Sequence, residues 1–293
     1  RGGTGIIGSD TKESDFIKHL FTASTHDCLL IFTNRGKCYW LKVYDIPSMS
    51  RQSKGRNIVN LLQMGDQKIA SIIPVGGMGE EDDKKDNREL VMATSNGVIK
   101  KTKLIAYSHP RSTGVTAIKL DPNDDLIGVA MTTGNNQIVL GTRDGMVIRF
   151  KESQARSMGR VSRGVKGIKL RPKDAVVAMV IAEEKSSLLT VCENGYGKRT
   201  GLENYRSQSR GGVGLINIKT TERNGKVVAL KVVDLKDELM MVTANGIIIR
   251  TGLDQIRPIG RNTQGVRLIK LKPEDKLVAV EKIAPEEVEE NPS

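Results

Sequence analysis

The sequence predicts an all-β fold in which a unit of about fifty residues repeats around a propeller-like ring of four-stranded blades. Two observations predict it: a regularly spaced arginine–glycine motif and a hairpin turn with the same period. Hydrophobic residues make up 38% of the 293-residue chain but aromatic residues only 3%, so we expect an aliphatic core. A period that persists along the whole chain indicates a repeat architecture, in which a single domain can exceed the usual length.

The arginine motif opens each repeat. It places an arginine three or four residues before a glycine, and the six glycines are separated by 50, 59, 50, 50 and 51 residues. A short strand of alternating polarity follows the glycine, as in residues 165–170, and this alternation is typical of a half-buried strand. The six motifs begin at Arg1, Arg51, Arg111, Arg160, Arg210 and Arg261.

The rest of the repeat contains three more strands. A polar turn such as residues 121–125 leads to an apolar, β-branched strand such as residues 176–180. A third strand, such as residues 188–191, enters an Asn-Gly, Asp-Gly or, in the first repeat, Asn-Arg-Gly turn, and a fourth strand that carries cations follows. Such turns are strong hairpin signals because asparagine, aspartate and glycine tolerate positive φ. The hairpin glycines are Gly36, Gly97, Gly145, Gly195 and Gly246.

The number of arginine motifs exceeds the number of hairpins, because the sixth repeat ends before its hairpin glycine. From the motifs we expect six blades, with a strand from the N-terminal end completing the last sheet and closing the ring, which would remove exposed sheet edges. Residues 1–283 should form one domain and the acidic residues 284–293 a disordered tail. Residues 76–86 are expected to form an exposed insertion, and residues 15–20 the one helical turn. Because Arg1 stands inside a motif, we expect the chain to be part of a longer protein.

Charge and missing motifs narrow the function. Lys and Arg number 46 against 34 Asp and Glu, a net charge of +12 that favours a polyanionic partner, nucleic acid before a membrane surface. No apolar run approaches the roughly 18 residues that span a membrane, so no membrane association is expected. The three cysteines lack the spacing of metal ligands, and no phosphate-cradling loop or nucleophile with a base is evident. We therefore expect no metal, no cofactor and no catalytic residue.

The candidate contacts are the cations and glycines of the arginine motifs and the cations of the fourth strands. An arginine fork holds phosphate, and nearby glycines let main-chain N–H groups approach the same anion. Few aromatic residues are available for stacking and no recognition helix is predicted, so the expected ligand is duplex DNA held by its backbone and bent around the rim. The alternative is that each arginine caps a strand end or pairs with an acid of the neighbouring repeat. The candidate DNA-binding residues are Arg1, Gly2, Gly3, Arg51, Lys54, Arg56, Lys100, Lys101, Arg111, Arg149, Arg160, Arg163, Lys166, Lys198, Arg199, Arg210, Arg250 and Arg261.

Several stretches resemble the C-terminal DNA-wrapping domain of the bacterial DNA gyrase A subunit, among them residues 25–30, 42–47, 92–102, 193–200 and 260–266. Arg1 to Gly5 aligns with the end of that family's gyrase box, Gln-Arg-Arg-Gly-Gly-Lys-Gly, with Thr4 in place of the lysine. The related subunit of topoisomerase IV lacks an intact box, so this alignment favours gyrase. Residues 208–214 resemble the box by their letters but belong to the fifth repeat by position.

The resemblance implies a six-bladed β-pinwheel, a ring whose blades exchange an outer strand, that wraps duplex DNA without sequence specificity. It further implies a parent type IIA topoisomerase that supercoils DNA negatively with ATP, with the catalytic tyrosine and the ATPase outside this chain. The implied partners are the remainder of the gyrase A polypeptide and the gyrase B polypeptide in an A2B2 enzyme of the bacterial cytoplasm and nucleoid, and the isolated domain would be a monomer. The alternatives are the corresponding domain of topoisomerase IV, a protein-interaction scaffold whose charge serves solubility, and an enzyme with its site in the central channel.

Overall fold

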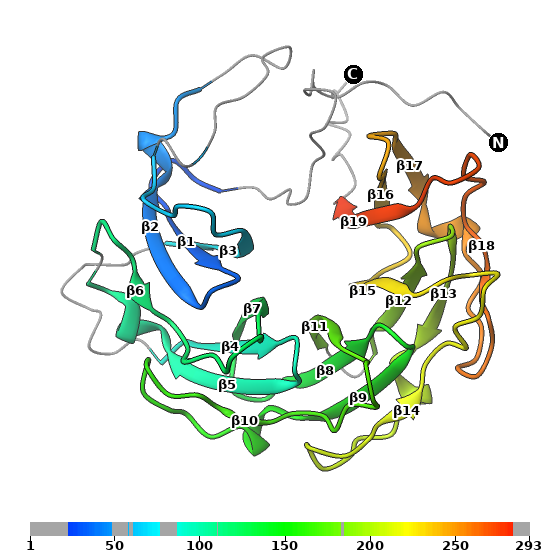
Figure 1. Cartoon of the computed structure of the whole chain (residues 1–293), viewed down its shortest axis with the longest axis horizontal. Helices are drawn as coiled ribbons and strands as arrows, with labels where there is room; N and C mark the ends of the chain where they lie inside the picture. Colours follow the sequence, from blue (N-terminus) through cyan, green and yellow to red (C-terminus); the bar gives the residue numbers. More distant parts are fainter. Residues whose placement is uncertain are drawn as a thin grey trace, which may run out of the picture.

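The computed structural model describes residues 23–48, 58, 61–76, 87–109, 111–182 and 185–283. Antiparallel sheets in these residues form five blades of an arc around a central axis (Figure 1). The all-β prediction is confirmed, but the predicted six blades are corrected to five in the part of the chain that the structure describes. The expected ring-closing strand, the helical turn at 15–20, most of the insertion at 76–86 and the tail at 284–293 lie outside the described residues.

Each blade runs from an inner strand at the axis to an outer strand at the rim. Blade 1 contains β3 (Ile69–Val75), β1 (Cys28–Thr33), β2 (Lys37–Lys42) and β6 (Val115–Thr116). Blade 2 contains β7 (Leu126–Thr132), β4 (Glu89–Thr94), β5 (Val98–Lys103) and β10 (Val165–Lys166). Blade 3 contains β11 (Val176–Ala182), β8 (Gln137–Thr142), β9 (Met146–Lys151) and β14 (Leu215–Ile216). Blade 4 contains β15 (Val227–Val233), β12 (Ser187–Cys192), β13 (Tyr196–Gly201) and β18 (Val266–Arg267). The described strands of blade 5 are β19 (Leu277–Ile283), β16 (Glu238–Thr243) and β17 (Ile248–Gly252).

Neighbouring blades exchange their outer strands. The chain forms the hairpin β8–β9 of blade 3, donates β10 to the outer edge of blade 2, and then returns to blade 3 as its inner strand β11. The same path links the other blades, so the outer edges of blades 1 to 4 are each covered by two residues from the following repeat. The blade count therefore follows the five hairpins, because an arginine motif supplies only a short strand to a blade that the preceding hairpin builds.

Short 3₁₀ helices end the third strand of each blade and lead toward the rim. They are η1 (Val43–Asp45), η4 (Leu104–Tyr107), η5 (Glu152–Gln154), η6 (Leu202–Asn204) and η7 (Leu253–Gln255). None has a side-chain N-cap, and each ends after one turn, when the cap residue's N–H donates to a helix carbonyl. The helices thus turn the chain out of the blade, and η4 to η7 place the arginine motifs that follow them at the periphery.

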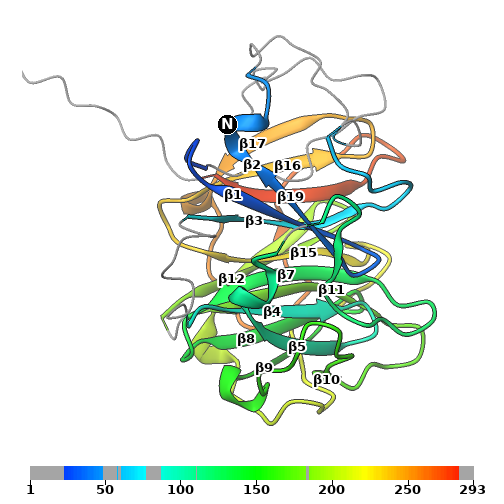
Figure 2. The same ribbon diagram turned by 90° about the vertical axis from the view of Figure 1, so that its left-hand side faces the viewer.

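The core lies between the blades and is mainly aliphatic. Val91 of blade 2 and Ile138 and Ile148 of blade 3, all fully buried, belong to one such cluster. Inner strands β3, β7, β11, β15 and β19 contact one another in that order around the axis, and the strands run across the thickness of the arc (Figure 2). They line a central cavity of about 590 Å³ whose charged lining includes the ion pair Lys231–Glu281, at 2.8 Å.

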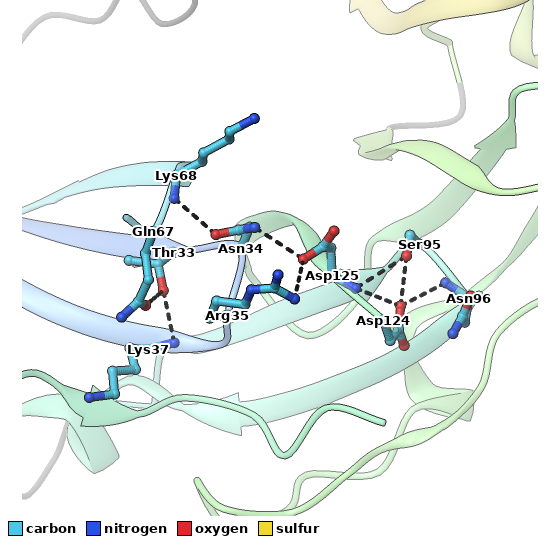
Figure 3. Close-up of polar contacts among 10 residues, drawn as sticks. All are labelled: Thr33, Asn34, Arg35, Lys37, Gln67, Lys68, Ser95, Asn96, Asp124 and Asp125. Atoms are coloured by element: carbon cyan, nitrogen blue, oxygen red, sulfur yellow. Dashed lines mark hydrogen bonds and ion pairs between the residues drawn. The ribbon is translucent and has the colours of Figure 1, made fainter. Parts of the chain in front are cut away.

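Three aspartates hold hairpin turns. Asp124 and Asp275, which are buried, and Asp174, which is half-buried, each follow a non-glycine residue with positive φ and precede an inner strand. In Figure 3, Asp124 Oδ1 accepts hydrogen bonds from Ser95 Oγ and from the main-chain N–H of Asn96. The equivalent carboxylates accept N–H groups from the hairpin turns of blades 3 and 5. Each blade with this aspartate thereby fastens its inner strand to its own hairpin.

A second set of polar contacts in Figure 3 joins blade 1 to blade 2. Asn34 Nδ2 donates to Asp125 Oδ1 at 3.0 Å, and Arg35 Nη1 lies 3.3 Å from the same oxygen. Asn34 Oδ1 in turn accepts the main-chain N–H of Lys68, at 2.9 Å. Asp125 directly follows Asp124, which holds the hairpin turn of blade 2. The two groups of contacts therefore fix the hairpins of blades 1 and 2 relative to each other.

Replacing Asp174 with alanine is expected to destabilise the domain by about 2 kcal/mol, because the main-chain N–H groups of Asp144 and Ala175 lose their acceptor in a half-buried turn. Urea unfolding followed by circular dichroism measures this loss. Lys173→Gly is the matched control, since Lys173 has φ of 62° and glycine relieves that strain. A loss in Asp174→Ala no larger than about 0.5 kcal/mol would contradict this role of the aspartate.

Candidate nucleic-acid interface

The four arginine motifs that the structure describes lie on the outer edge of the arc, because each of them immediately precedes an exchanged outer strand (Figure 1). The motif glycines make this placement possible. Gly164 and Gly214 have φ of 106° and 77°, and a Cβ at these positions would collide with the main-chain carbonyls of Ile99 and Val147. Any other residue would push the motif away from the third strand, so the glycines hold the rim against the blade.

Successive motifs are joined into a continuous band, which we call the belt: the motif loops and outer strands of residues 111–119, 156–169, 206–219 and 257–270. A main-chain N–H that follows one outer strand donates to a carbonyl in the next motif loop. The bonds are Lys119 N to Ser162 O at 3.2 Å, Lys169 N to Gly212 O at 2.8 Å, and Lys219 N to Thr263 O at 2.8 Å. The belt therefore repeats its geometry from blade to blade.

Three motif arginines reinforce the belt. Arg160, Arg210 and Arg261 are partly exposed, and Nη1 of each donates to a carbonyl of the preceding outer strand. The acceptors are Thr116 O, Lys166 O and Ile216 O, at 3.1, 3.0 and 3.1 Å. Arg210 Nε also donates to Gln154 O, at 2.9 Å. A guanidinium has five N–H donors, so one or two structural bonds leave others for an anion. The strand-capping alternative and a phosphate-binding role are thus compatible in the same side chain.

Two predicted contacts are buried and are removed from the interface. Lys100 and Lys198 are 0% exposed. Lys198 Nζ donates to Gly260 O and Arg261 O at 2.8 and 2.6 Å. Lys100 Nζ donates to Arg160 O, the counterpart of Arg261 O, and to Ala117 O, which follows the outer strand β6. Burial, together with the neighbouring arginine, lowers the pKa of Lys100 to about 7 and that of Lys198 to about 8. These buried lysines hold the motif loops against the blades by donating hydrogen bonds to main-chain carbonyls of the loops.

Lys101, Arg149 and Arg199 are a second correction, because they are at most 9% exposed and clamp neighbouring blades instead of facing outward. Arg149 Nη1 donates to carbonyls around η6, and Arg199 Nε donates to the carbonyl that follows η7. Lys101 Nζ lies between two carboxylates, 2.9 Å from Glu89 and 3.4 Å from Glu152. These cations recur in the fourth strand of the sequence repeat, which is the third strand of each blade counted from the axis. Their regular spacing therefore reflects packing between blades, where a buried cation needs a hydrogen-bond or ion-pair partner.

The remaining predicted contacts differ in their surroundings. Arg111, Arg163 and Lys166 are exposed on the belt, and Arg163 pairs with Asp121. Arg250 is exposed on β17 and pairs with Glu238, away from the motif loops. Arg1, Gly2, Gly3, Arg51, Lys54 and Arg56 lie outside the described residues.

Two rows of exposed cations were not among the DNA-binding residues predicted from the sequence. One row stands four residues before three motif arginines, and the other five residues after the motif glycines. None of these side chains forms an ion pair with any residue that the structure describes. Their spacing is as regular in the sequence as that of the motif, and this period is the signal that could have found them. The two rows are Arg156, Arg206 and Arg257, and Lys119, Lys169, Lys219 and Lys270.

Over the described ranges, no helix is long and apolar enough to cross a membrane. The described residues also hold no group of three His, Cys, Asp or Glu side chains arranged to bind a metal ion. We base the function on the belt, because its exposed cations recur at equivalent points of successive repeats.

Comparisons with known proteins agree with this architecture. The model of the DNA gyrase C-terminal domain, a β-propeller, matches residues 1–24, 29–75, 88–133, 136–183, 186–234 and 237–284. The DNA gyrase A subunit of Haloquadratum walsbyi is 46% identical over 284 residues, and that of Salmonella typhimurium 44% over 285. These alignments cover 96% and 97% of this chain but 33% and 32% of the relatives, so the chain spans about a third of their length.

Two solved structures share the fold. The C-terminal domain of DNA topoisomerase IV has a TM-score of 0.79 at 25% identity, over 89% of this chain and 80% of that one. The DNA gyrase A C-terminal domain has a TM-score of 0.75 at 26% identity, over 94% of this chain and 91% of that one. The fold alone does not separate the two groups, and the family assignment rests on the matched family model and on the identity to the gyrase A proteins. The chain therefore belongs to the family of DNA gyrase C-terminal domains.

Proposed function

We propose that this chain binds duplex DNA without sequence specificity and bends it around the belt. The observation that carries the proposal is the recurrence of exposed cations at equivalent points of successive repeats, represented by Arg156, Arg206 and Arg257, which have no ion-pair partner among the described residues. A duplex presents phosphates at a regular spacing, so a band that repeats its charge regularly can follow it over several helical turns. The contacts that we propose are the two rows together with Arg111, Arg160, Arg163, Lys166, Arg210 and Arg261.

Electrostatics sets the expected behaviour. About six phosphate contacts would make log K fall with log salt with a slope of roughly −5. Aromatic side chains are rare on the belt, which favours a duplex over a single strand, because base stacking needs such platforms. The described structure is all strands and short 3₁₀ turns, so sequence preference would come from DNA deformability.

The parent activity that we propose follows from the family. The chain would be the accessory domain of an ATP-dependent type IIA topoisomerase that introduces negative supercoils, with the catalytic tyrosine and the ATPase on other domains or subunits. Its partners would be the rest of the gyrase A polypeptide and the gyrase B polypeptide, in the bacterial cytoplasm and nucleoid, and residues 1–283 would act as one monomeric domain without a cofactor. The likeness to the topoisomerase IV domain supports a second candidate, the corresponding role in that enzyme.

The test compares duplexes of increasing length in a gel-shift assay at several salt concentrations. Wrapping predicts affinity that grows over several helical turns and falls steeply with salt, whereas a protein-interaction scaffold would show neither trend. Supercoiling of relaxed plasmid by the parent enzyme, with and without this domain, then separates the gyrase role from that of topoisomerase IV.

The double variant Arg160→Ala with Arg261→Ala is expected to reduce DNA bending, measured by energy transfer between dyes at the two duplex ends. Each substitution also removes one bond to an outer-strand carbonyl, so we expect a stability loss of about 1 kcal/mol per site. Thermal melting measures that loss and shows whether the fold survives. Unchanged bending by a folded double variant would argue that these arginines serve only the belt's structure.

A further inference from the structure

We infer that blade 4 carries a phosphate-binding pocket beside the belt, formed around Tyr196, Arg223 and Arg267. The inference deepens the proposed function, on which it rests for the source of the phosphate: the duplex held by the belt. Arg267 lies on the outer strand β18, and Arg223 lies in the turn that precedes the inner strand β15. The pocket therefore extends the contact surface from the rim across the hairpin side of the blade, by which we mean the side that carries the turn between β12 and β13.

The two arginines of the pocket are held at the ring of Tyr196. It measures about 410 Å³, and the guanidinium carbons of Arg223 and Arg267 lie 4.9 and 5.5 Å from the centre of the Tyr196 ring. Arg267 Nη2 also donates to Tyr196 Oη, at 2.9 Å. Hydrogen bonds from Arg223 and Arg267 lower the pKa of the Tyr196 phenol. An aromatic face restrains the guanidinium planes while leaving most of their N–H groups free for another acceptor.

The charge around the pocket is unbalanced. Five cations line it, the two arginines with Lys270, Lys272 and Lys276, against two carboxylates, those of Glu274 and Asp275. Asp275 Oδ1 already accepts two main-chain N–H groups, and Lys276 pairs with Glu193 at 3.1 Å. Neither arginine forms an ion pair with a carboxylate of the described residues. A cavity with this surplus of forked and point-charge donors suits a phosphate group.

Blade 4 differs from the other described blades at this place, because two departures from the repeat meet there. The position of Tyr196 is occupied by Lys37, Val98, Met146 and Ile247 in the other blades. Arg223 stands in residues 220–226, a turn that lacks the proline and the aspartate of its counterparts in blades 2, 3 and 5 and is held by Asn224. Departures from an otherwise consistent local pattern are expected where a site has been added.

Continuity with the belt identifies the source of the phosphate. Lys270, which lines the pocket, belongs to the row of lysines that follows the motif glycines. A duplex that follows the belt past Arg261 and drifts toward the hairpin side therefore meets the pocket with its backbone. A phosphodiester there would gain two charge-assisted contacts that a short duplex, confined to the belt, does not reach.

The test uses the full chain with Arg223→Gln and Arg267→Gln. The matched control is Arg143→Gln with Arg171→Gln, two exposed arginines on the hairpin side of blade 3 that line neither the central cavity nor the pocket of blade 4. Both variants lose two positive charges. For a duplex of about 40 base pairs, the pocket variant should bind about tenfold more weakly and lose about 2 units of salt slope, while a duplex of about 12 base pairs is unaffected. Side-chain Nε signals of Arg223 and Arg267, followed by NMR during titration with inorganic phosphate, report on occupancy of the pocket directly.

Selective weakening of the long duplex by the pocket variant, with no effect of the control, supports the inference. Equal effects of the two variants, or Nε signals that do not move with phosphate, overturn the pocket and leave the belt's function intact. If the unaltered chain fails to hold DNA while phosphate still shifts the two signals, the proposed function falls and the phosphate site stands without its DNA source.

Discussion

Replacing Arg156 and Arg206 with glutamine will weaken binding of a long duplex about a hundredfold at about 0.1 M salt and lower the salt slope by about 2. Both side chains are exposed at equivalent points of the belt, and neither has an ion-pair partner among the described residues. Their replacement would therefore remove proposed phosphate contacts without breaking an ion pair of the described residues. Fluorescence anisotropy with a labelled duplex at four or five salt concentrations measures affinity and slope together.

The control for this prediction removes the same charge elsewhere. Lys185 and Lys236 are exposed in loops that enter the second strands β12 and β16, on the side of the blades away from the hairpin turns. Their replacement with glutamine should leave the slope within about half a unit of the unaltered chain, apart from a small effect of net charge. If both double variants weaken binding equally, the protein attracts DNA by its overall charge and the belt has no special role.

Replacing Lys198 with methionine will destabilise the domain by about 3 kcal/mol at neutral pH, because the main-chain carbonyls of Gly260 and Arg261 lose their shared donor in a buried position. Methionine fills the space without replacing that donor. Chemical unfolding measures the loss. Ile148→Met is the matched control, because Ile148 is the buried counterpart of Lys198 in blade 3 and its side chain donates no hydrogen bond; it should cost less than about 1.5 kcal/mol.

The same variant tests the lowered pKa of Lys198. The folded chain releases the proton near pH 8, whereas the unfolded chain keeps it up to the ordinary pKa of lysine, about 10.4. The unfolded state therefore binds more protons in this window, and the stability of the unaltered protein rises with pH. The cost of Lys198→Met should grow by about 1.4 kcal/mol per pH unit from pH 8 upward, a trend that Ile148→Met lacks. A pH-independent cost would mean that Lys198 stays protonated in the folded state.

The hairpins show why the class of the fold could be predicted while its blade count could not. A hairpin turn rich in asparagine, aspartate and glycine is a local feature that its own residues impose, and all five such turns join strands two and three of a blade. An arginine motif, in contrast, marks a strand that is donated to another blade. Whether it opens a new blade depends on pairing across some seventy residues, as between Gly197 and Val266, and no local pattern carries that information.

The cations of the candidate interface also fall into two groups, those whose exposure could be predicted from the sequence and those whose burial could not. The belt arginines Arg111, Arg160 and Arg163 could be predicted because their position beside a glycine turn implies an exposed loop. Lys100 and Arg149 could not, because a cation in an alternating strand looks the same whether it faces solvent or the next blade. Only the packing of blades shows that Lys100 meets main-chain carbonyls and that Arg149 reaches η6.

The sequence by itself determined the period, the strand and turn order, the glycines of the rim and the surplus of positive charge, since each arises from residues a few positions apart. The tertiary structure decided the number of blades, the exchange of outer strands, which cations face outward and where Tyr196, Arg223 and Arg267 meet. These depend on contacts between residues far apart in the chain, and the free energy of burying a charge with or without a partner selects among them.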